Sequence, residues 1–528
     1  MSKLKKQSFL KGALILAIAN LVVKGIGALF KIPLVRFILE SDGIAVYNAA
    51  YTIYNVLFMV ATAGLPVAIS KMISESVAKE NFAETRKIVK ISRNLLVTVG
   101  AAGTAILFFG ARLFSDAIDM PSAAPAMMAL SPALFFVAVM SVYRGTFQGM
   151  SNMVPTAVSE FIEALGKLVI GLMLAYFMLP LGKDMSATGA ILGVSTGACL
   201  GAIFLFVSYA RVRKELKRKA AESKGEVSRS KKILSRLLQL AIPITIGSAV
   251  FTLASVIDLV MISKQLAGLG FDEQTRKVMY GYYSGYAVTM FNLPPTIITS
   301  LSISIMPAIT SAIVAKKRTL ARKTTETAVR ITLLFALPCA VGMSVLSAPV
   351  LKFAFNDTNA AGMLSVLSYG IIFVSLVMVT NAIIQALGKV WMPVLNMLIG
   401  GAVKVITNFI LVGNIDININ GAPYGTVLCY VTTAVLNLIV IHKAMHPDYS
   451  ILFVIKSVIC SALMGVFAYF TFSFVNGLLG STLALIVAIA VGVVSYLAFL
   501  ILLKALRRED VEAMPGSKII IKLLGKFI

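Results

Sequence analysis

The chain has 528 residues, of which 58% are hydrophobic and 13% are charged, and its mean hydropathy is +0.90. Soluble domains are about 45–50% apolar and about 25% charged, so this composition excludes an ordinary soluble fold and indicates an integral membrane protein. The formal net charge is +25. The charge lies in short clusters between apolar runs, which is typical of membrane topology signals and argues against a nucleic-acid-binding protein.

Apolar runs long enough to cross the hydrocarbon core, which takes about 20 helical residues, recur from one end of the chain to the other. Read as helices, they predict an all-α integral membrane protein with about fourteen spans. The predicted spans are 10–38, 43–69, 88–111, 124–148, 153–179, 187–209, 236–263, 278–311, 328–353, 362–387, 390–413, 422–444, 451–475 and 480–505.

The basic clusters fall on one side of this predicted topology. They lie at the N-terminus, between spans two and three, between six and seven, between eight and nine, and in the C-terminal tail. By the positive-inside rule both termini are expected in the cytoplasm, and the clusters are expected to contact anionic membrane lipids.

The sequence contains a weak internal repeat with an offset of 237 residues. Gln148 and Gln385 share this offset, as do Lys167 and Lys404. Such a repeat predicts two parallel six-helix lobes related by a pseudo-two-fold axis along the membrane normal. The expected domains are an N-terminal lobe (1–210), a basic cytoplasmic linker (211–235), a C-terminal lobe (236–446), and two further spans with a basic cytoplasmic tail (447–528).

The first predicted span carries charges that need an explanation. Lys24 and Lys31 share one helix face with Asn20, and Arg36 follows near the end of the span. A cation at the centre of a membrane helix costs roughly 2.5–3.5 kcal/mol, so these side chains are expected to face water or counter-charge in a site. The alternative for Arg36, for Lys31 and for the deeper Lys24 is that they reach up to the lipid headgroups.

Polar stripes on four predicted spans suggest the lining of a cavity between the lobes. The alternative is that these side chains form interhelical hydrogen bonds. The candidate lining residues are Asn20, Asn48, Tyr51, Asn55, Ser255, Tyr282, Tyr286 and Asn292.

Several ionisable residues in the spans are candidates for ion coupling or charge balance. Asp258 has no partner in helical spacing on its own span, whereas Glu163 and Lys167 are spaced i, i+4 and could satisfy one another together with Glu160. Lys404 is the repeat counterpart of Lys167.

Signatures of enzymes are missing from the sequence. It contains no phosphate-binding GxxxxGK[ST] motif and no HExxH motif, and the spans leave no room for a nucleotide-binding loop. His442 and His446 have no other ligand in metal-binding spacing, so no metal site and no cofactor are expected.

Five stretches resemble a known family of transporters. They are "QSFLKGALIL" (7–16), "GLPVAISKMISE" (64–75), "YRGTFQGMSNMVP" (143–155), "NLPPTIITSLSISIMPAIT" (292–310) and "QALGKVWMPVLNMLIGGAVK" (385–404). They are similar to the polysaccharide-transport proteins of low-GC Gram-positive bacteria. This is the stage V sporulation protein B group, kin of the MurJ-type lipid II flippases in the multidrug/oligosaccharidyl-lipid/polysaccharide exporter superfamily.

The resemblance implies a two-lobed fold of fourteen helices in the bacterial plasma membrane and export of an undecaprenyl-diphosphate-linked saccharide by alternating access. Family members often carry arginines on the first helix, where this chain has Lys24 and Lys31. With the charge pattern, the resemblance predicts that Lys24, Lys31 and Arg36 bind the substrate diphosphate. Coupling to the membrane potential, protons or sodium is expected.

Two other functions remain open. One is a cation-coupled drug exporter of the same fold, which would need an acidic, aromatic cavity. The other is a nontransporting scaffold that binds envelope-synthesis enzymes.

Overall fold

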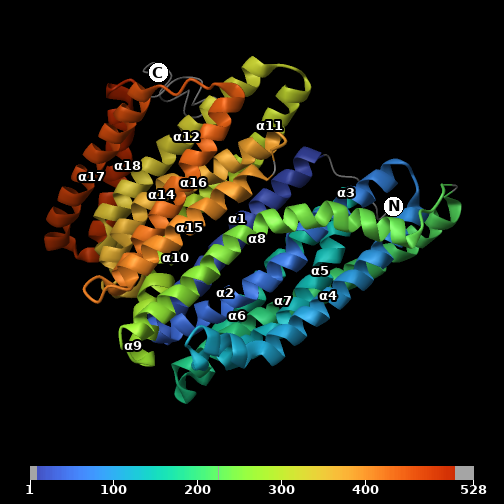
Figure 1. The fold of residues 1–528 in the computed structure, drawn as a ribbon, viewed down its shortest axis with the longest axis horizontal. Coiled ribbons are helices and arrows are strands. Elements are labelled where there is room, and N and C mark those ends of the chain that lie inside the picture. Colours follow the sequence, from blue (N-terminus) through green and yellow to red (C-terminus); the bar gives the residue numbers. More distant parts are fainter. Residues whose placement is uncertain (1–8, 224, 390, 506–528) are drawn as a thin grey trace. The chain divides into compact units, whose positions relative to one another are not determined.

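The computed structural model describes residues 9–223, 225–389 and 391–505, which are helical over most of their length (Figure 1). The described residues contain no β-strand. The elements are α1 (Phe9–Pro33), η1 (Leu34–Leu39), α2 (Glu40–Thr62), α3 (Gly64–Ala78), α4 (Phe82–Ala117), η2 (Pro121–Ala123), α5 (Ala124–Gly149), α6 (Val154–Met178), η3 (Leu179–Leu181), α7 (Lys183–Glu222), α8 (Ser230–Gly268), α9 (Glu273–Tyr280), η4 (Gly281–Ala287), α10 (Val288–Phe291), α11 (Leu293–Val314), α12 (Arg318–Val345), α13 (Ser347–Phe355), α14 (Ala361–Ala386), α15 (Met392–Val412), η5 (Asn418–Gly421), α16 (Ala422–Met445), α17 (Ile451–Leu479) and α18 (Ser481–Leu502).

The expected class, an all-α multi-pass membrane protein, is confirmed. Within the described residues, eleven helical stretches are long and apolar enough to cross a membrane. One of them, Val22–Ala78, runs through most of the first predicted span and all of the second, and it contains the π-helical turn η1 directly after Pro33. The number fourteen therefore stays a prediction. The basic residues of the extreme N-terminus and the C-terminal tail lie outside the described residues.

The chain forms two compact units. Unit 1 comprises 1–267 and 271–281, and unit 2 comprises 268–270 and 282–528. Helix α8, which the repeat assigns to the second lobe, is grouped with the helices of the first lobe by its packing. The division into repeat-based lobes is a statement about sequence ancestry, and its boundaries stay a prediction.

The predicted linker 211–235 is more ordered than its composition suggests. Helix α7 continues to Glu222 and α8 begins at Ser230, so only a short turn separates them. Asn81 donates from Nδ2 to the carbonyl of Glu226 at 2.8 Å, and the Ser228 hydroxyl donates to Glu84 at 2.8 Å. The turn is therefore held against the start of α4.

Unit 1 is built around close helix crossings made possible by glycine. Glycines recur every four residues on α7 at positions 189, 193, 197 and 201. A Cβ atom at Gly193 would collide with the backbone of Gly171 on α6, and one at Gly197 would collide with the carbonyl of Glu163. Such small-residue faces let membrane helices approach closely and gain van der Waals contact where lipid supplies no hydrophobic drive.

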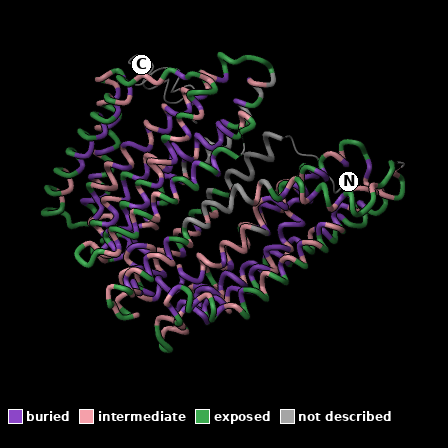
Figure 2. The backbone as a smooth tube through the Cα atoms, viewed as in Figure 1, coloured by how far each residue is buried: buried purple, intermediate pink, exposed green. Residues whose placement is uncertain are grey.

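Unit 2 is centred on α14, whose side chains are mostly buried against α11, α12 and α16. Helices α17 and α18 pair with each other and cover α12, where the Tyr496 hydroxyl donates to the carbonyl of Leu334 at 2.8 Å. Many other residues of α17 and α18 are exposed (Figure 2), and large apolar side chains such as Phe470 and Phe474 are among them. Exposed apolar side chains of this kind are expected to face lipid in a membrane helix.

Candidate functional site

Two lysines in unit 1 lie among polar and aromatic groups contributed by α1, α2 and α6. Lys31 of α1 donates from Nζ to the side-chain oxygen of Asn48 on α2, 3.5 Å away. Lys167 of α6 lies near enough to Lys31 for the two charges to repel each other. We call Lys31, Asn48 and Lys167, together with the three rings described next, the lysine cluster.

Three aromatic rings surround the Lys167 ammonium. Its Nζ atom lies 4.9 Å from the ring centroid of Phe30, 5.0 Å from that of Tyr51 and 5.9 Å from that of Tyr47. Ring faces are electron-rich and attract a cation by up to about 2 kcal/mol each when water is excluded. The rings thus stabilise a charge inside an apolar helix bundle without neutralising it.

The rings belong to an aromatic row along α2. Tyr47 stacks on Tyr51 with centroids 5.7 Å apart, Tyr51 contacts Tyr54 at 5.5 Å, and Tyr54 contacts Phe58 at 5.4 Å. The spacing of four, three and four residues keeps all four side chains on one helix face.

A glycine on α6 makes room for one of the three rings that form an aromatic cage around Lys167. Gly171 lies one turn after Lys167, and a Cβ there would lie 2.9 Å from the edge of the Phe30 ring. The absence of a side chain at Gly171 therefore lets Phe30 reach the ammonium of Lys167.

Glu163, which the sequence pairs with Lys167, instead accepts a hydrogen bond from Arg144 of α5, with 2.8 Å between Nη2 and Oε2. The Arg144 Nε also donates to the Ser159 hydroxyl at 3.0 Å. Glu160 lies near Arg144, and its buried Oε2 makes no hydrogen bond within the described residues. Glu163 therefore forms its ion pair with Arg144, and the Lys167 ammonium lies among ring faces.

The other candidates on α1, η1 and α2 lie along the same chain segment. Asn20 and Lys24 are exposed on α1, and Asn55 is half-buried on α2. Arg36 lies in η1 with its guanidinium 5.2 Å from the centroid of the Phe37 ring, which is itself exposed. A cation over an exposed ring is consistent with either proposed role of Arg36, at the headgroups or in substrate binding.

Two candidates lie on α8. Asp258 is buried, with a relative exposure of 8%, whereas Ser255, almost one turn earlier, is exposed. A buried carboxylate in a membrane helix is a candidate functional group by its cost alone.

The remaining candidates belong to unit 2 and are described there by themselves. Tyr282 accepts from Asn359 at 2.8 Å and packs on Tyr286, whose ring lies 4.7 Å from that of Phe355. Asn292 is exposed at the end of α10, and Lys404 is buried on α15. The structure therefore groups Tyr282 with Tyr286 in unit 2, and groups Lys31 with Asn48, Tyr51 and Lys167 in unit 1.

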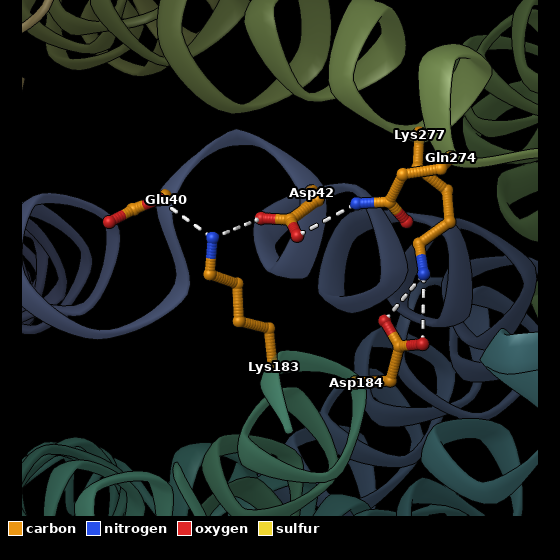
Figure 3. Close-up of polar contacts among 6 residues, drawn as sticks. All are labelled: Glu40, Asp42, Lys183, Asp184, Gln274 and Lys277. Carbon is orange, nitrogen blue, oxygen red and sulfur yellow. Dashed lines mark hydrogen bonds and ion pairs between the residues drawn. The ribbon is translucent and has the colours of Figure 1, made fainter.

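A second polar cluster in unit 1 joins α2, α7 and α9 (Figure 3). Lys183 lies 2.7 Å from Glu40 and 3.1 Å from Asp42, while Lys277 contacts both carboxylate oxygens of Asp184 at 2.7 and 2.8 Å. The Lys277 side chain is almost fully buried, so the bidentate contact with Asp184 compensates a desolvated charge. We call these residues the α2–α7–α9 ion-pair cluster.

Helix α9, which supplies Lys277, begins at a capping carboxylate. Asp272 accepts hydrogen bonds from the backbone N–H groups of Gln274 and Thr275 and from the Thr275 hydroxyl. The hydrogen bond from the Thr275 hydroxyl, helped by those from the backbone, holds the pKa of Asp272 below its ordinary value. The stabilisation by this cap is therefore present above the ordinary Asp pKa and is lost as the pH falls through the lowered one.

Sequence reasoning missed Phe30, Tyr47 and Arg144. The spacing of Tyr47, Tyr51, Tyr54 and Phe58 carried a signal, because it is helical and aromatic on one face. Nothing in the sequence indicated that Lys167, more than a hundred residues away, would lie against that face.

Comparison with known proteins places this fold in one class. The structure is similar to a lipid II flippase MurJ in an inward closed conformation, with a TM-score of 0.69 and 16% identity over 92% of this chain and 98% of that one. It is also similar to an inward-facing multidrug resistance MATE family transporter of the MOP superfamily, with a TM-score of 0.67 and 14% identity over 84% and 98%. The fold is therefore that of MOP superfamily proteins.

Sequence comparison gives the family. The polysaccharide biosynthesis protein family matches residues 9–314, more than half of the chain, and this chain belongs to it. It is 26% identical to the stage V sporulation protein B of Bacillus subtilis (strain 168), over 97% of this chain and 98% of that one. It is 24% identical to the lipid II flippase MurJ of the same organism, over 92% and 94%.

Proposed function

We propose that the protein is a flippase, not an enzyme, and that it moves an undecaprenyl-diphosphate-linked saccharide, such as lipid II or a related cell-envelope precursor, across the bacterial plasma membrane. The proposal rests mainly on the lysine cluster, in which the charges of Lys31 and Lys167 interact within an apolar helix bundle. Membership of the polysaccharide biosynthesis family and likeness to a lipid II flippase support the proposal.

The chemistry of the cluster suits a diphosphate. Two neighbouring cations repel each other, and a ligand with about one negative charge per phosphate removes that repulsion. The ring faces around Lys167 attract its cation without cancelling the charge, so the charge stays available to an anion. Asn48 and Tyr51 offer an amide and a hydroxyl to the sugar, while a polyprenyl tail needs only lipid.

The remaining candidates take supporting roles in this proposal. Lys24 and Arg36 would attract the diphosphate, and Asn20 and Asn55 would contact the saccharide in unit 1. Ser255, Tyr282, Tyr286 and Asn292 would offer further hydroxyl and amide groups. Asp258, Glu160, Glu163 and Lys404 would provide ion coupling or charge balance as the site opens alternately to the two sides of the membrane.

A cation-coupled drug exporter is the second candidate, because its fold class includes the MATE transporter described above. The lysine cluster argues against it, since a cationic drug would be repelled by Lys31 and Lys167. A scaffold that binds envelope-synthesis enzymes would leave both lysines without a substrate. We therefore favour the flippase. From the distribution of basic clusters, we propose that both termini lie in the cytoplasm.

The proposal is tested by reconstituting the purified protein in liposomes with a panel of fluorescent lipids. The panel contains undecaprenyl-diphosphate saccharides of differing head groups, an undecaprenyl monophosphate, and a cationic dye. We expect transfer of one or more diphosphate saccharides between leaflets and no transport of the dye. Dye transport without saccharide transfer would establish the drug exporter, and transport of neither would favour the scaffold.

A further inference from the structure

Three arginines lie near a pair of contacting tyrosine rings where α4, α5 and α7 pack together in unit 1. Tyr143 of α5 and Tyr209 of α7 have ring centroids 5.0 Å apart and an interplanar angle of 37°. Arg93 and Arg213 lie near enough to both tyrosine hydroxyls to interact with them electrostatically, and Arg86 lies near enough to that of Tyr209. We call these five residues the α4–α7 arginine cluster.

Within the described residues, the arginines of this cluster donate to no protein acceptor. Arg86, Arg93 and Arg213 are exposed and make no ion pair or hydrogen bond with any residue in the described part of the chain. The two tyrosine rings are buried, and their hydroxyls likewise form no hydrogen bond within the described ranges. Three positive charges held near two hydroxyl donors are suited to a phosphate group.

The internal repeat shows what occupies the equivalent place in unit 2. At the offset of 237 residues Arg93 corresponds to Arg330. The Arg330 guanidinium lies 3.9 Å from the centroid of Phe453, which is near the start of α17. The arginine of the second repeat is thus covered by a helix that the first repeat does not have.

The cover continues along the same stripe of α12. Leu334 and Val341 pack with Phe453 and other side chains of α17 and α18. At the same offset Leu334 corresponds to Val97, one turn after Arg93, and Val341 corresponds to Thr104, whose hydroxyl donates to the carbonyl of Ser131 at 3.0 Å. Phe108, one turn after Thr104, is 44% exposed. Unit 1 therefore has, next to its arginines, an apolar strip at the position that α17 and α18 cover in unit 2.

We propose that the α4–α7 arginine cluster binds the headgroup phosphate of an anionic membrane phospholipid, whose acyl chains lie along the strip from Val97 to Phe108. This goes beyond the proposed transport function and does not depend on it. A lipid fits better than a partner helix because the cluster carries three uncompensated positive charges, and a phospholipid supplies an anion and an apolar tail in one molecule.

The test measures binding of phosphatidylglycerol to the full-length, detergent-purified protein by native mass spectrometry, with phosphatidylcholine as the uncharged comparison. The variant R86Q/R93Q/R213Q is compared with K214Q/K217Q/R218Q, which loses the same charge at exposed positions of α7. Since each basic residue near an anionic headgroup contributes about fivefold, we expect phosphatidylglycerol binding to weaken by roughly 100-fold in the first variant. The second variant should stay within about threefold of the wild type.

A single conservative substitution distinguishes loss of lipid binding from misfolding of the triple variant. Tyr209→Phe keeps the ring contact with Tyr143 and removes one hydroxyl donor, and we expect it to weaken phosphatidylglycerol binding by about tenfold. Equal losses in the two triple variants would overturn the proposal in favour of diffuse surface attraction. Displacement of the lipid by about 10 mM inorganic phosphate would instead indicate a soluble-anion site. At this concentration the screening length is about 30 Å, so screening alone does not remove a direct contact. A dimer that forms in the wild type but not in R86Q/R93Q/R213Q, with lipid binding unchanged, would overturn the proposal in favour of a second copy of the chain on this face.

Discussion

At the scale of single residues, the protein keeps cations in an apolar bundle by two different means. Arg144 is neutralised by Glu163 at 2.8 Å, whereas Lys167 lies among the rings of Phe30, Tyr47 and Tyr51. A neutralised cation has little remaining attraction for an anion, but a cation held by ring faces keeps its full charge. This difference is why Lys167, and not Arg144, belongs to the proposed binding site.

The aromatic cage gives a prediction for Tyr51. Replacing it by leucine removes one ring face from Lys167, which costs about 1–2 kcal/mol and should weaken binding of an undecaprenyl-diphosphate saccharide by roughly tenfold. Tyr51→Phe retains the ring and should stay within about threefold of the wild type, the difference being one hydroxyl contact. Titration of the fluorescent lipid into protein-containing nanodiscs measures both. Equal losses in the two variants would show that the hydroxyl, not the ring face, matters.

The residue scale also shows where sequence reasoning stops. The positions of Lys31, Asn48 and Tyr51 follow from helix periodicity, because they lie on two consecutive segments of one hydrophobic hairpin. The partner of Glu163 did not follow, since an i, i+4 lysine is the obvious local choice and Arg144 lies on another helix. Contacts between distant helices depend on packing, and packing here depends on glycine faces.

At the scale of helices, the α6–α7 crossing positions the lysine cluster. Gly193 on α7 meets the backbone at Gly171 on α6, and Gly171 in turn makes room for Phe30. The spacing of glycines on α7 is visible in the sequence, yet the sequence does not tell which helix they face. That information is carried by the complementary glycines of α6.

We predict that Gly193→Val destabilises unit 1. The added side chain would force α6 and α7 apart, at a cost of about 1–3 kcal/mol or more, and should lower the midpoint of thermal unfolding in detergent by several degrees. Gly401→Val on α15 is the matched control, because nothing lies within 4 Å of a Cβ at that position. We expect the control to unfold at the wild-type midpoint. Equal midpoints of thermal unfolding for the two variants would contradict the role of the α6–α7 crossing in stability.

The α2–α7–α9 ion-pair cluster gives a second prediction at this scale. Asp184→Asn leaves the Lys277 ammonium, with 6% of its side chain exposed, without a countercharge, and should destabilise the protein by about 3 kcal/mol. Glu40→Gln removes a carboxylate that is 65% exposed and contacts Lys183, so it should cost less than about 1 kcal/mol. Thermal unfolding of both variants at the same pH compares the two pairs. A larger loss for Glu40→Gln would show that burial does not set their relative importance.

At the scale of the whole molecule, composition and the lengths of the apolar runs predicted more than local patterns did. The apolar fraction and the run lengths led to an all-α multi-pass protein, which the helices confirm. The units formed by packing differ from the repeat boundaries at α8, because packing depends on contacts in the folded chain and a repeat records its ancestry. The basic stretch before α8 reads as a solvated linker in sequence, yet helix α7 extends into it.

Charge at this scale predicts how transport is driven. An inside-negative potential of 100 mV favours outward movement of each negative charge by about 2.3 kcal/mol, and it draws an emptied, cationic site back toward the cytoplasm. We therefore expect flipping in vesicles to slow when potassium and valinomycin clamp the potential to zero at fixed pH and sodium gradients. An unchanged rate would assign the driving force to an ion gradient or to the lipid gradient alone.

The central claim, that Lys31 and Lys167 together recognise a lipid diphosphate, is tested most directly by flipping in proteoliposomes of the variant K31Q/K167Q. The control is Lys264→Gln, which removes an exposed lysine of α8. With equal amounts of folded protein in the membrane, we predict that the double variant loses at least about 100-fold of the initial rate with an undecaprenyl-diphosphate saccharide, since each charged contact contributes about 1.5–3 kcal/mol. The control should keep the wild-type rate. Wild-type flipping by K31Q/K167Q would contradict the claim.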